Sequence, residues 1–195
     1  MTSPQPPLSP IPPRSRSPRL NSAFQHLMAI HWSASWCYFV LFVTGFFMAD
    51  WPREFPLRPL TYDFHKSMGV LVTGLLLWRI AILLKVCWKK YTRRTPKLTP
   101  EWWRKAALHG SLYLFMLAVP LSGFLLSNSY QSNNVRFLGV AVPDIFPQNS
   151  DLVDLGRNLH FWSAYVFLAF IILHVFQQQK VAKSIWRKWM KAFNR

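Results

Sequence analysis

Leu159–Phe176 reads LHFWSAYVFLAFIILHVF, an apolar stretch with a histidine near each end. His160 and His174 are fourteen residues apart, which is close to four helical turns, so both imidazoles project from nearly the same face of one helix. By helix rise they lie about 21 Å apart along the axis, most of the roughly 30 Å hydrocarbon thickness of a bilayer. A histidine inside a membrane helix is costly and is by default a functional-site hypothesis.

The remaining apolar residues of this 195-residue chain, which is 51% hydrophobic, also fall into long blocks. Each block is apolar nearly all round and long enough to span a bilayer, which excludes a surface amphipathic helix. The sequence therefore predicts an all-α integral membrane four-helix bundle whose spans are Phe24–Ala49, Phe64–Cys87, Ala106–Ser127 and Leu159–Gln177.

The net charge of +16 is distributed unevenly along the chain. The first and third connections are nearly balanced, whereas both tails and the second connection are strongly basic, which is the positive-inside pattern. This pattern places both termini on the cytoplasmic side and favours contact with anionic lipid over nucleic acid. The basic residues of the second connection are Lys85, Lys89, Lys90, Arg93, Arg94, Lys97, Arg104 and Lys105.

Composition divides the chain into three regions. Residues 1–22 are rich in Pro, Ser and Arg and are expected to be a disordered tail. Residues 23–180 contain the four spans, and residues 181–195 form a basic C-terminal tail. The two cysteines, Cys37 and Cys87, are expected at different depths and unpaired, and the absence of Cys-x-x-Cys-His excludes covalent haem attachment.

Depth sorts the histidines into two levels. If the first span runs from inside to outside, His31 and His174 share the inner level. His65, in the first turn of the second span, and His160 share the outer level. Each level thus receives one imidazole from each of two helices. Zinc prefers further Cys or carboxylate ligands, and the four spans contain no Asp or Glu. Two imidazoles alone suit the axial positions of haem, and bis-His ligation favours electron transfer.

Other residues near the two levels have a functional and a structural interpretation. Arg79 lies fourteen residues after His65 and is expected to pair with a haem propionate at the inner level; otherwise it extends to the inner headgroups. Lys66 and Arg157, beside the outer histidines, are candidates for outer propionates or for attracting a small anion, or are plain interfacial cations. His109 is a candidate to contact a propionate or a quinone, or to replace His31 as ligand.

Glycines on the histidine faces are compatible with the flat space that a haem needs. Gly45 and Gly123 lie fourteen residues after His31 and His109, and Gly69 is one turn from His65. Small-residue helix contacts, which are common in membranes, explain such glycines equally well.

The chain resembles the bacterial cytochrome b561 family. The resemblance runs from about Asn21 to Lys183 and rests on four segments in order: AIHWSASW, FHKSMGVLVTGLLLWR, LHGSLYLFMLAVPLSGFLLS and LHFWSAYVFLAFIILHVF. It implies a four-helix membrane protein with two haem b groups, ligated by His31, His65, His160 and His174, with Arg79 and His109 at motif positions. It further implies electron transfer with a quinone as one partner.

The resemblance leaves the electron donor open. One branch of the family oxidises superoxide and carries an acidic residue directly after the outer ligand of the fourth helix, where this chain has Phe161. The two functions we expect are a membrane oxidoreductase linking quinone to a small substrate, superoxide among the candidates, and a haem-bearing anchor that connects a partner redox protein to quinone. A homodimer is also compatible. The expected location is a bacterial-type inner membrane or a thylakoid-type internal membrane.

Overall fold

The computed structural model describes residues 18–91 and 99–179, with 187 and 190. Within these ranges there are four long helices, α1 (Pro18–Asp50), α2 (Arg58–Tyr91), α3 (Pro100–Tyr130) and α4 (Ser150–Gln177). One short hairpin of β1 (Arg136–Phe137) and β2 (Val140–Ala141) lies in the connection between α3 and α4. All four helices are long and apolar enough to cross a membrane. The predicted all-α, multi-pass integral membrane fold is confirmed, whereas the side on which the termini lie stays a prediction.

The helices extend beyond the apolar blocks because capping residues set their starts. Thr99 caps α3, its side chain accepting from the Trp102 amide, and Pro100 occupies the first turn, where its missing N–H costs nothing. Asn149 caps α4 by accepting from the amides of Asp151 and Leu152. At the other end of the chain, α1 begins at Pro18, inside the stretch expected as a disordered tail. The tail at 181–195 falls almost entirely outside the described residues.

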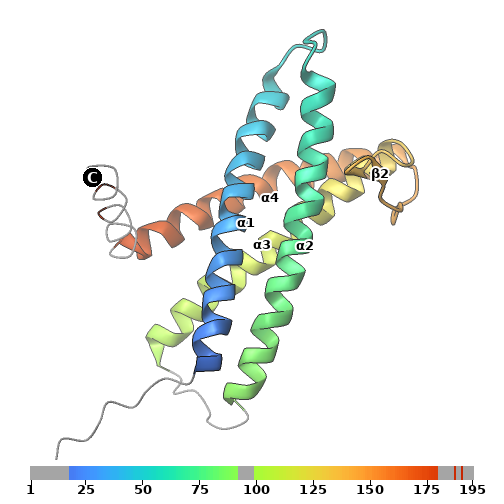
Figure 1. The fold of residues 1–195 in the computed structure, drawn as a ribbon. Helices are drawn as coiled ribbons and strands as arrows, with labels where there is room; N and C mark the ends of the chain where they lie inside the picture. The colour runs from blue at the N-terminus through green and yellow to red at the C-terminus, as the bar shows by residue number, and fades with distance from the viewer. Residues whose placement is uncertain (1–17, 92–98, 180–186, 188–189, 191–195) are drawn as a thin grey trace, which may run out of the picture.

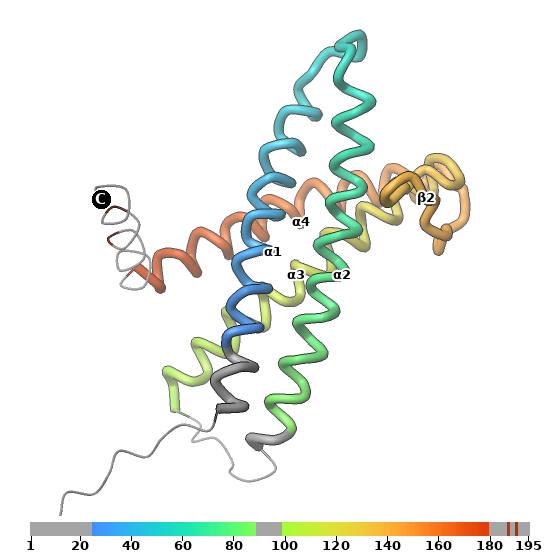
Figure 2. The backbone as a smooth tube through the Cα atoms, viewed as in Figure 1, coloured from blue at the N-terminus to red at the C-terminus, as the bar shows by residue number. Residues whose placement is uncertain are grey.

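The helices form two antiparallel hairpins that cross each other (Figure 1). α1 packs along α2 and α3 along α4, with a smaller contact between α2 and α3. The backbone tube makes the crossing plain, with the α1–α2 hairpin lying across the α3–α4 hairpin (Figure 2). α1 reaches α4 at Tyr38 and Phe167, whose ring centres lie 5.1 Å apart.

The apolar core lies midway between the two histidine levels. Its buried members come from all four helices and are Ala34, Tyr38, Val72, Leu76, Met116 and Phe167. Four of them are seven residues after a histidine of the same helix, which is half of the fourteen-residue spacing: Tyr38, Val72, Met116 and Phe167. The core therefore separates an inner from an outer polar level.

Two residues shape the contact between α3 and its neighbours. Pro120 has no N–H to give to the Met116 carbonyl one turn earlier, and the buried Tyr38 hydroxyl donates to that carbonyl at 3.5 Å. Gly156 of α4 touches the α3 backbone: a Cβ there would lie 2.7 Å from the Leu126 nitrogen. Such close approach requires glycine, which explains why α3 and α4 pack so tightly.

The connection between α3 and α4, residues 131–149, folds into an outer cap. The fully buried Asn128 side chain donates to the Asp144 carboxylate at 2.8 Å and accepts from the Ile145 amide at 3.1 Å. The other Asp144 oxygen accepts from the Asn133 amide at 2.9 Å. The β1–β2 pair completes the cap, with Gly139 at φ 85° in its turn. The expected connection of about 128–158 is thus shorter, because α4 begins at Ser150.

Candidate functional site

The structure brings the histidines together in the two predicted pairs. The ring centres of His65 on α2 and His160 on α4 lie 6.2 Å apart, with their planes at 83°. Those of His31 on α1 and His174 on α4 lie 6.4 Å apart, with their planes at 80°. The fourteen-residue spacing on α4 accounts for this arrangement, because it projects His160 toward α2 at the outer level and His174 toward α1 at the inner level. We call these the outer pair and the inner pair.

These separations fit two imidazoles on opposite sides of one metal ion. Metal–nitrogen bonds of about 2.0–2.1 Å, plus the distance from nitrogen to ring centre, put two such rings roughly 6.3 Å apart. Within residues 18–91 and 99–179, no group of three or more His, Cys, Asp or Glu side chains is arranged to hold a metal. A donor set of two facing imidazoles matches axial ligation of haem, whose porphyrin supplies the other four nitrogens.

The outer pair is held by groups on α1 and α3. The Thr44 hydroxyl lies 3.0 Å from His65 Nδ1. His160 Nδ1 donates to the Val119 carbonyl at 2.9 Å and lies 3.4 Å from the Ser122 hydroxyl. Nδ1 of each outer histidine therefore contacts the hairpin partner of its own helix, α1 for His65 and α3 for His160. Nε2 of each ring makes no hydrogen bond in the described part of the chain.

Two glycines lie directly against the outer rings. A Cβ at Gly45 would lie 3.3 Å from His65 Cε1, and one at Gly123 would lie 3.1 Å from His160 Cε1. Both distances are tighter than ordinary van der Waals contact, so an alanine would push the ring. Gly69, the third glycine of the sequence prediction, meets nothing within 4 Å among the described residues. Gly45 and Gly123 thus make room at the outer level, and Gly69 does not.

The inner pair has a different set of partners. Arg79 Nη1 lies 3.0 Å from His31 Nδ1, and the Arg79 guanidinium lies over the Tyr113 ring at 5.5 Å. Among the described residues, neither Arg79 Nε nor His174 Nδ1 has a hydrogen-bond partner, although both atoms are buried. A partly buried cation with an unsatisfied donor beside the pair fits a haem propionate, the anion that the sequence predicted for Arg79.

His109 joins the inner level as a third imidazole. Its ring centre lies 5.3 Å from that of His174, shorter than the separation of either facing pair. Its Nδ1 donates to the Lys105 carbonyl at 2.7 Å. His31 and His174, at 6.4 Å, have the separation expected for two axial ligands, so the geometry favours His31 over His109 as the partner of His174.

The two outer cations have other partners. Lys66 Nζ donates to the backbone carbonyl and side-chain oxygen of Asn134, both at 2.9 Å, and pairs with Asp63 at 2.9 Å. Ser67 beside it donates to the Arg136 carbonyl at 2.6 Å, so both residues fasten the outer cap to α2. Arg157 is exposed and pairs with Asp154 at 2.8 Å. Both cations thus have partners within the chain, and their assignment to outer propionates or to a small anion stays a prediction.

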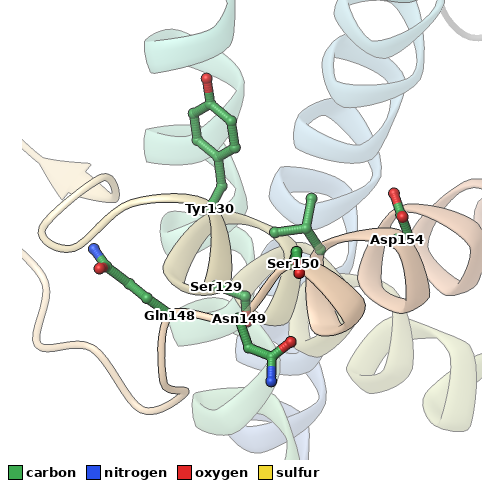
Figure 3. A pocket seen from close by; sticks show the side chains of 7 residues that line it. Ser129, Tyr130, Gln148, Asn149, Ser150 and Asp154 are labelled. Carbon is green, nitrogen blue, oxygen red and sulfur yellow. The ribbon is translucent and has the colours of Figure 1, made fainter.

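The sequence did not predict a role at the site for Thr44, Ser122 or Gly156. A signal for the first two exists: α1 contains Thr44-Gly45-Phe46 and α3 contains Ser122-Gly123-Phe124, the same pattern at the same distance from a histidine. A pocket at the junction of α3 and α4 is also present (Figure 3), but no histidine lines it. Its lining residues are Ser129, Tyr130, Gln148, Asn149, Ser150, Val153 and Asp154.

Four membrane-length helices that present two facing histidine pairs define a multi-pass membrane protein of the haem-binding helical class. A model of the prokaryotic cytochrome b561 family matches residues 26–181. The chain belongs to this family, whose members are transmembrane haem b electron-transfer proteins.

Two relatives from Escherichia coli (strain K12) agree with this assignment. The protein named cytochrome b561 homolog 2 is 25% identical over 162 residues, which cover 78% of this chain and 80% of the relative. Cytochrome b561 homolog 1 is 31% identical over 115 residues, covering 54% of this chain and 61% of the relative. The family implies haem b as the cofactor, and the two facing pairs, the glycines against the outer rings and the unsatisfied inner donors fit that group.

Proposed function

We propose that this protein is a transmembrane electron-transfer cytochrome with two bis-His haem b groups, which exchanges electrons with the membrane quinone pool. His65 and His160 would hold the outer haem, and His31 and His174 the inner one. The observation that carries the proposal is the near-identical separation of the two facing pairs, 6.2 and 6.4 Å, at the two ends of one apolar core.

The protein's own residues have three roles in this function. The four paired histidines would hold the two haems, and two imidazoles for each iron favour electron transfer over oxygen chemistry. The bound haem supplies a one-electron iron couple. The core between the levels, with Tyr38 and Phe167 in aromatic contact at 5.1 Å, excludes water from the space between the two pairs. Arg79 is placed to neutralise a propionate of the inner haem.

The inner level supports the quinone link. Because the His109 Nδ1 proton is donated to the Lys105 carbonyl, the neutral ring has an unprotonated Nε2 that can accept a proton from a quinol hydroxyl. Oxidation of a quinol releases two protons with its two electrons, so a proton acceptor beside the inner haem suits that reaction. His109 is exposed on α3.

Spectroscopy of the purified protein tests the proposal. Two haems per chain, with a reduced α band of b type, and reduction of both by a short-chain quinol are the expected results. A protein that contains no haem, or whose haems a quinol cannot reduce, would overturn the proposal. The matched control is the variant in which all four paired histidines are replaced by Ala, which should purify without haem.

Superoxide as the donor has weaker support. Steering of a small anion depends on local positive charge, and both outer cations of the sequence prediction are paired with carboxylates. Stopped-flow mixing of the oxidised protein with superoxide decides this point. A fast reduction that slows as salt is raised would establish superoxide as a donor. A slow, salt-independent reduction would leave quinol or a protein donor.

One observation favours the second candidate function, a haem-bearing anchor for a partner oxidoreductase. The outer cap is ordered, is fastened to α2 through Lys66 and Ser67, and exposes the apolar side chains of Leu138, Val140 and Ile145. A partner redox protein that docks there would deliver electrons beside the outer pair. Co-purification of a stoichiometric partner, lost when these three side chains are changed to Ser, would establish the anchor. Isolation of the chain alone with full quinol activity would exclude it.

A further inference from the structure

The two helices that carry no outer histidine repeat one short pattern. On α1, Thr44 and Gly45 follow His31 by thirteen and fourteen residues. On α3, Ser122 and Gly123 follow His109 by the same distances. In both helices the hydroxyl residue and the glycine lie against the histidine of the hairpin partner, His65 on α2 for α1 and His160 on α4 for α3. Each outer imidazole is thus met by one hydroxyl–glycine pair.

The hydroxyl protons decide which atom of each histidine carries hydrogen. Thr44 Oγ1 lies 2.9 Å from the Val40 carbonyl and 3.2 Å from the Leu41 carbonyl, and both carbonyls are acceptors for its single proton. With that proton held by its own helix, the oxygen accepts from His65 Nδ1 at 3.0 Å, and in the neutral ring Nε2 is left without a proton. The result at His160 is the same, because the Val119 carbonyl has no proton to give.

Ser122 is a weaker acceptor for His160 than Thr44 is for His65. Its proton also goes to the Val119 carbonyl, at 2.8 Å, and its oxygen lies 3.4 Å from His160 Nδ1. The carbonyl is the nearer acceptor for His160, at 2.9 Å, and Ser122 adds a second, longer contact. Thr44 is therefore the principal Nδ1 acceptor for His65, whereas Ser122 shares that role with Val119.

We infer that Thr44 and Ser122 are positioning residues for the outer pair: Thr44 fixes the Nδ1–H tautomer of His65, and Ser122 supports the tautomer that Val119 sets at His160, so that both Nε2 atoms are presented to one iron. This inference rests on the proposed function. A metal-bound imidazole that donates its other N–H is oriented by that bond and becomes a stronger electron donor. A stronger donor stabilises the oxidised iron, so both residues lower the reduction potential of the outer haem.

Thr44→Val is the sharpest test because it keeps the side-chain shape and removes the acceptor. At a fixed ambient potential, the ratio of reduced to oxidised outer haem should rise about tenfold, which is roughly 59 mV for a one-electron couple. Ser122→Ala should shift it in the same direction by less, because Val119 remains. Thr44→Ser restores the hydroxyl and should restore the potential. The inner haem should be unaffected throughout.

The matched control is Thr73→Val on α2. Thr73 precedes Gly74 in the same Val-Thr-Gly sequence and donates to its own helix carbonyl at 2.7 Å, as Thr44 does. No atom lies within 4 Å of a Cβ at Gly74 in the described part of the chain, so this copy of the pattern faces no imidazole. Thr73→Val should leave both potentials unchanged.

The outcomes separate this inference from the proposed function. A wild-type protein without haem refutes the proposed function itself. If the wild type binds two haems and Thr44→Val leaves both potentials in place, or moves both equally, the positioning role is refuted and the proposed function stands. A shift confined to one potential, reversed by Thr44→Ser and absent in Thr73→Val, establishes the role.

Discussion

The outer and inner histidine pairs have almost the same separation and very different surroundings. At the outer pair, both Nδ1 atoms are donors toward Thr44 or Val119, and glycines lie against both rings. At the inner pair, Arg79 is the partner of His31. Because a guanidinium has only donors, His31 Nδ1 accepts, and its neutral ring carries the proton on Nε2. The nitrogen that the outer rings leave free for iron is therefore protonated at His31.

On the proposed function, the outer ligands would be oriented by a hydroxyl and a carbonyl of the chain, whereas the inner ligands would lie beside the cation Arg79. Arg79 would pair with a propionate of the inner haem, and His31 would hold that haem through Nε2 with its proton on Nδ1. The same anion would give the unsatisfied Arg79 Nε a partner. The inner level also contains His109, which no outer residue matches, so it is equipped for an additional polar ligand.

The largest expected effect comes from removing one ligand of each pair in turn. His160→Ala should lose the outer haem and keep the inner one, and His174→Ala should do the reverse, so that each variant binds half of the wild-type haem. The cause is loss of one of two axial bonds. Haem per protein, measured by pyridine haemochrome, checks the result. If each variant keeps both haems, the assignment of the pairs is wrong.

Removing the extra imidazole of the inner level should affect the reaction and not the haem content. His109→Ala removes the proton acceptor that we propose for quinol oxidation, so haem reduction by quinol should slow by about 10²-fold, the lower range for general-base contributions. Both haems should remain bound.

His26→Ala is the control for His109, because His26 is another exposed histidine near the start of the spans. It should leave the quinol rate unchanged. Loss of a haem in His109→Ala, together with its retention in His31→Ala, would instead show that His109 is the inner ligand.

Filling the space beside the outer rings should weaken only the outer site. Gly123→Ala places a methyl group 3.1 Å from His160 Cε1, and Gly45→Ala places one 3.3 Å from His65 Cε1. Displacing a ring in a packed site costs about 1–3 kcal/mol, so the outer haem should bind roughly 5- to 150-fold more weakly. Haem transfer to apomyoglobin measures this loss. Gly69→Ala, with open space at its Cβ, is the control and should bind both haems normally.

The four spans and the two histidine pairs could be predicted from the sequence. The spans follow from the length of the apolar blocks, and the pairs follow from helical periodicity together with the alternating direction of the spans. Fourteen residues return a side chain to the same face, so His160 and His174 had to point toward partners at two depths. The levels of His31 and His65 followed from the alternating direction of the spans. Tyr38 and Phe167 lie at mid-depth for the same reason, because each follows a histidine of its own helix by seven residues, half of the fourteen-residue spacing.

The contacts that the sequence did not predict join residues far apart in the chain. Lys66 donates to Asn134, which is 68 residues away in the sequence, and no local sequence pattern distinguishes Lys66 from an interfacial cation. A threonine in a membrane helix ordinarily bonds its own backbone, as Thr73 does, so Thr44 became recognisable only when the packing placed His65 against it. The close approach of Gly156 to Leu126 fixes how α3 and α4 face each other, which in turn sets these contacts.

The smallest expected effect concerns the charge at the inner level. Arg79→Gln removes a cation beside the inner pair, and a nearby positive charge favours the reduced haem, which is more negative by one electron. The reduced-to-oxidised ratio of the inner haem should therefore fall by about tenfold at fixed potential, roughly 59 mV. Potentiometric titration should show one of two steps moving downward, opposite in sign to the outer-site shift of Thr44→Val.

Two further variants separate charge from shape at Arg79. Arg79→Lys keeps the charge and loses the planar guanidinium, so it should recover most of the inner potential if a propionate is the partner. Lys85→Gln removes an exposed cation from the same helix and should move neither step, because solvent and headgroups screen it. A shift of both steps in Arg79→Gln would mean that Arg79 acts on the bundle as a whole. The contrast between an outer pair oriented by neutral groups and an inner pair beside a cation would then be wrong for the inner pair.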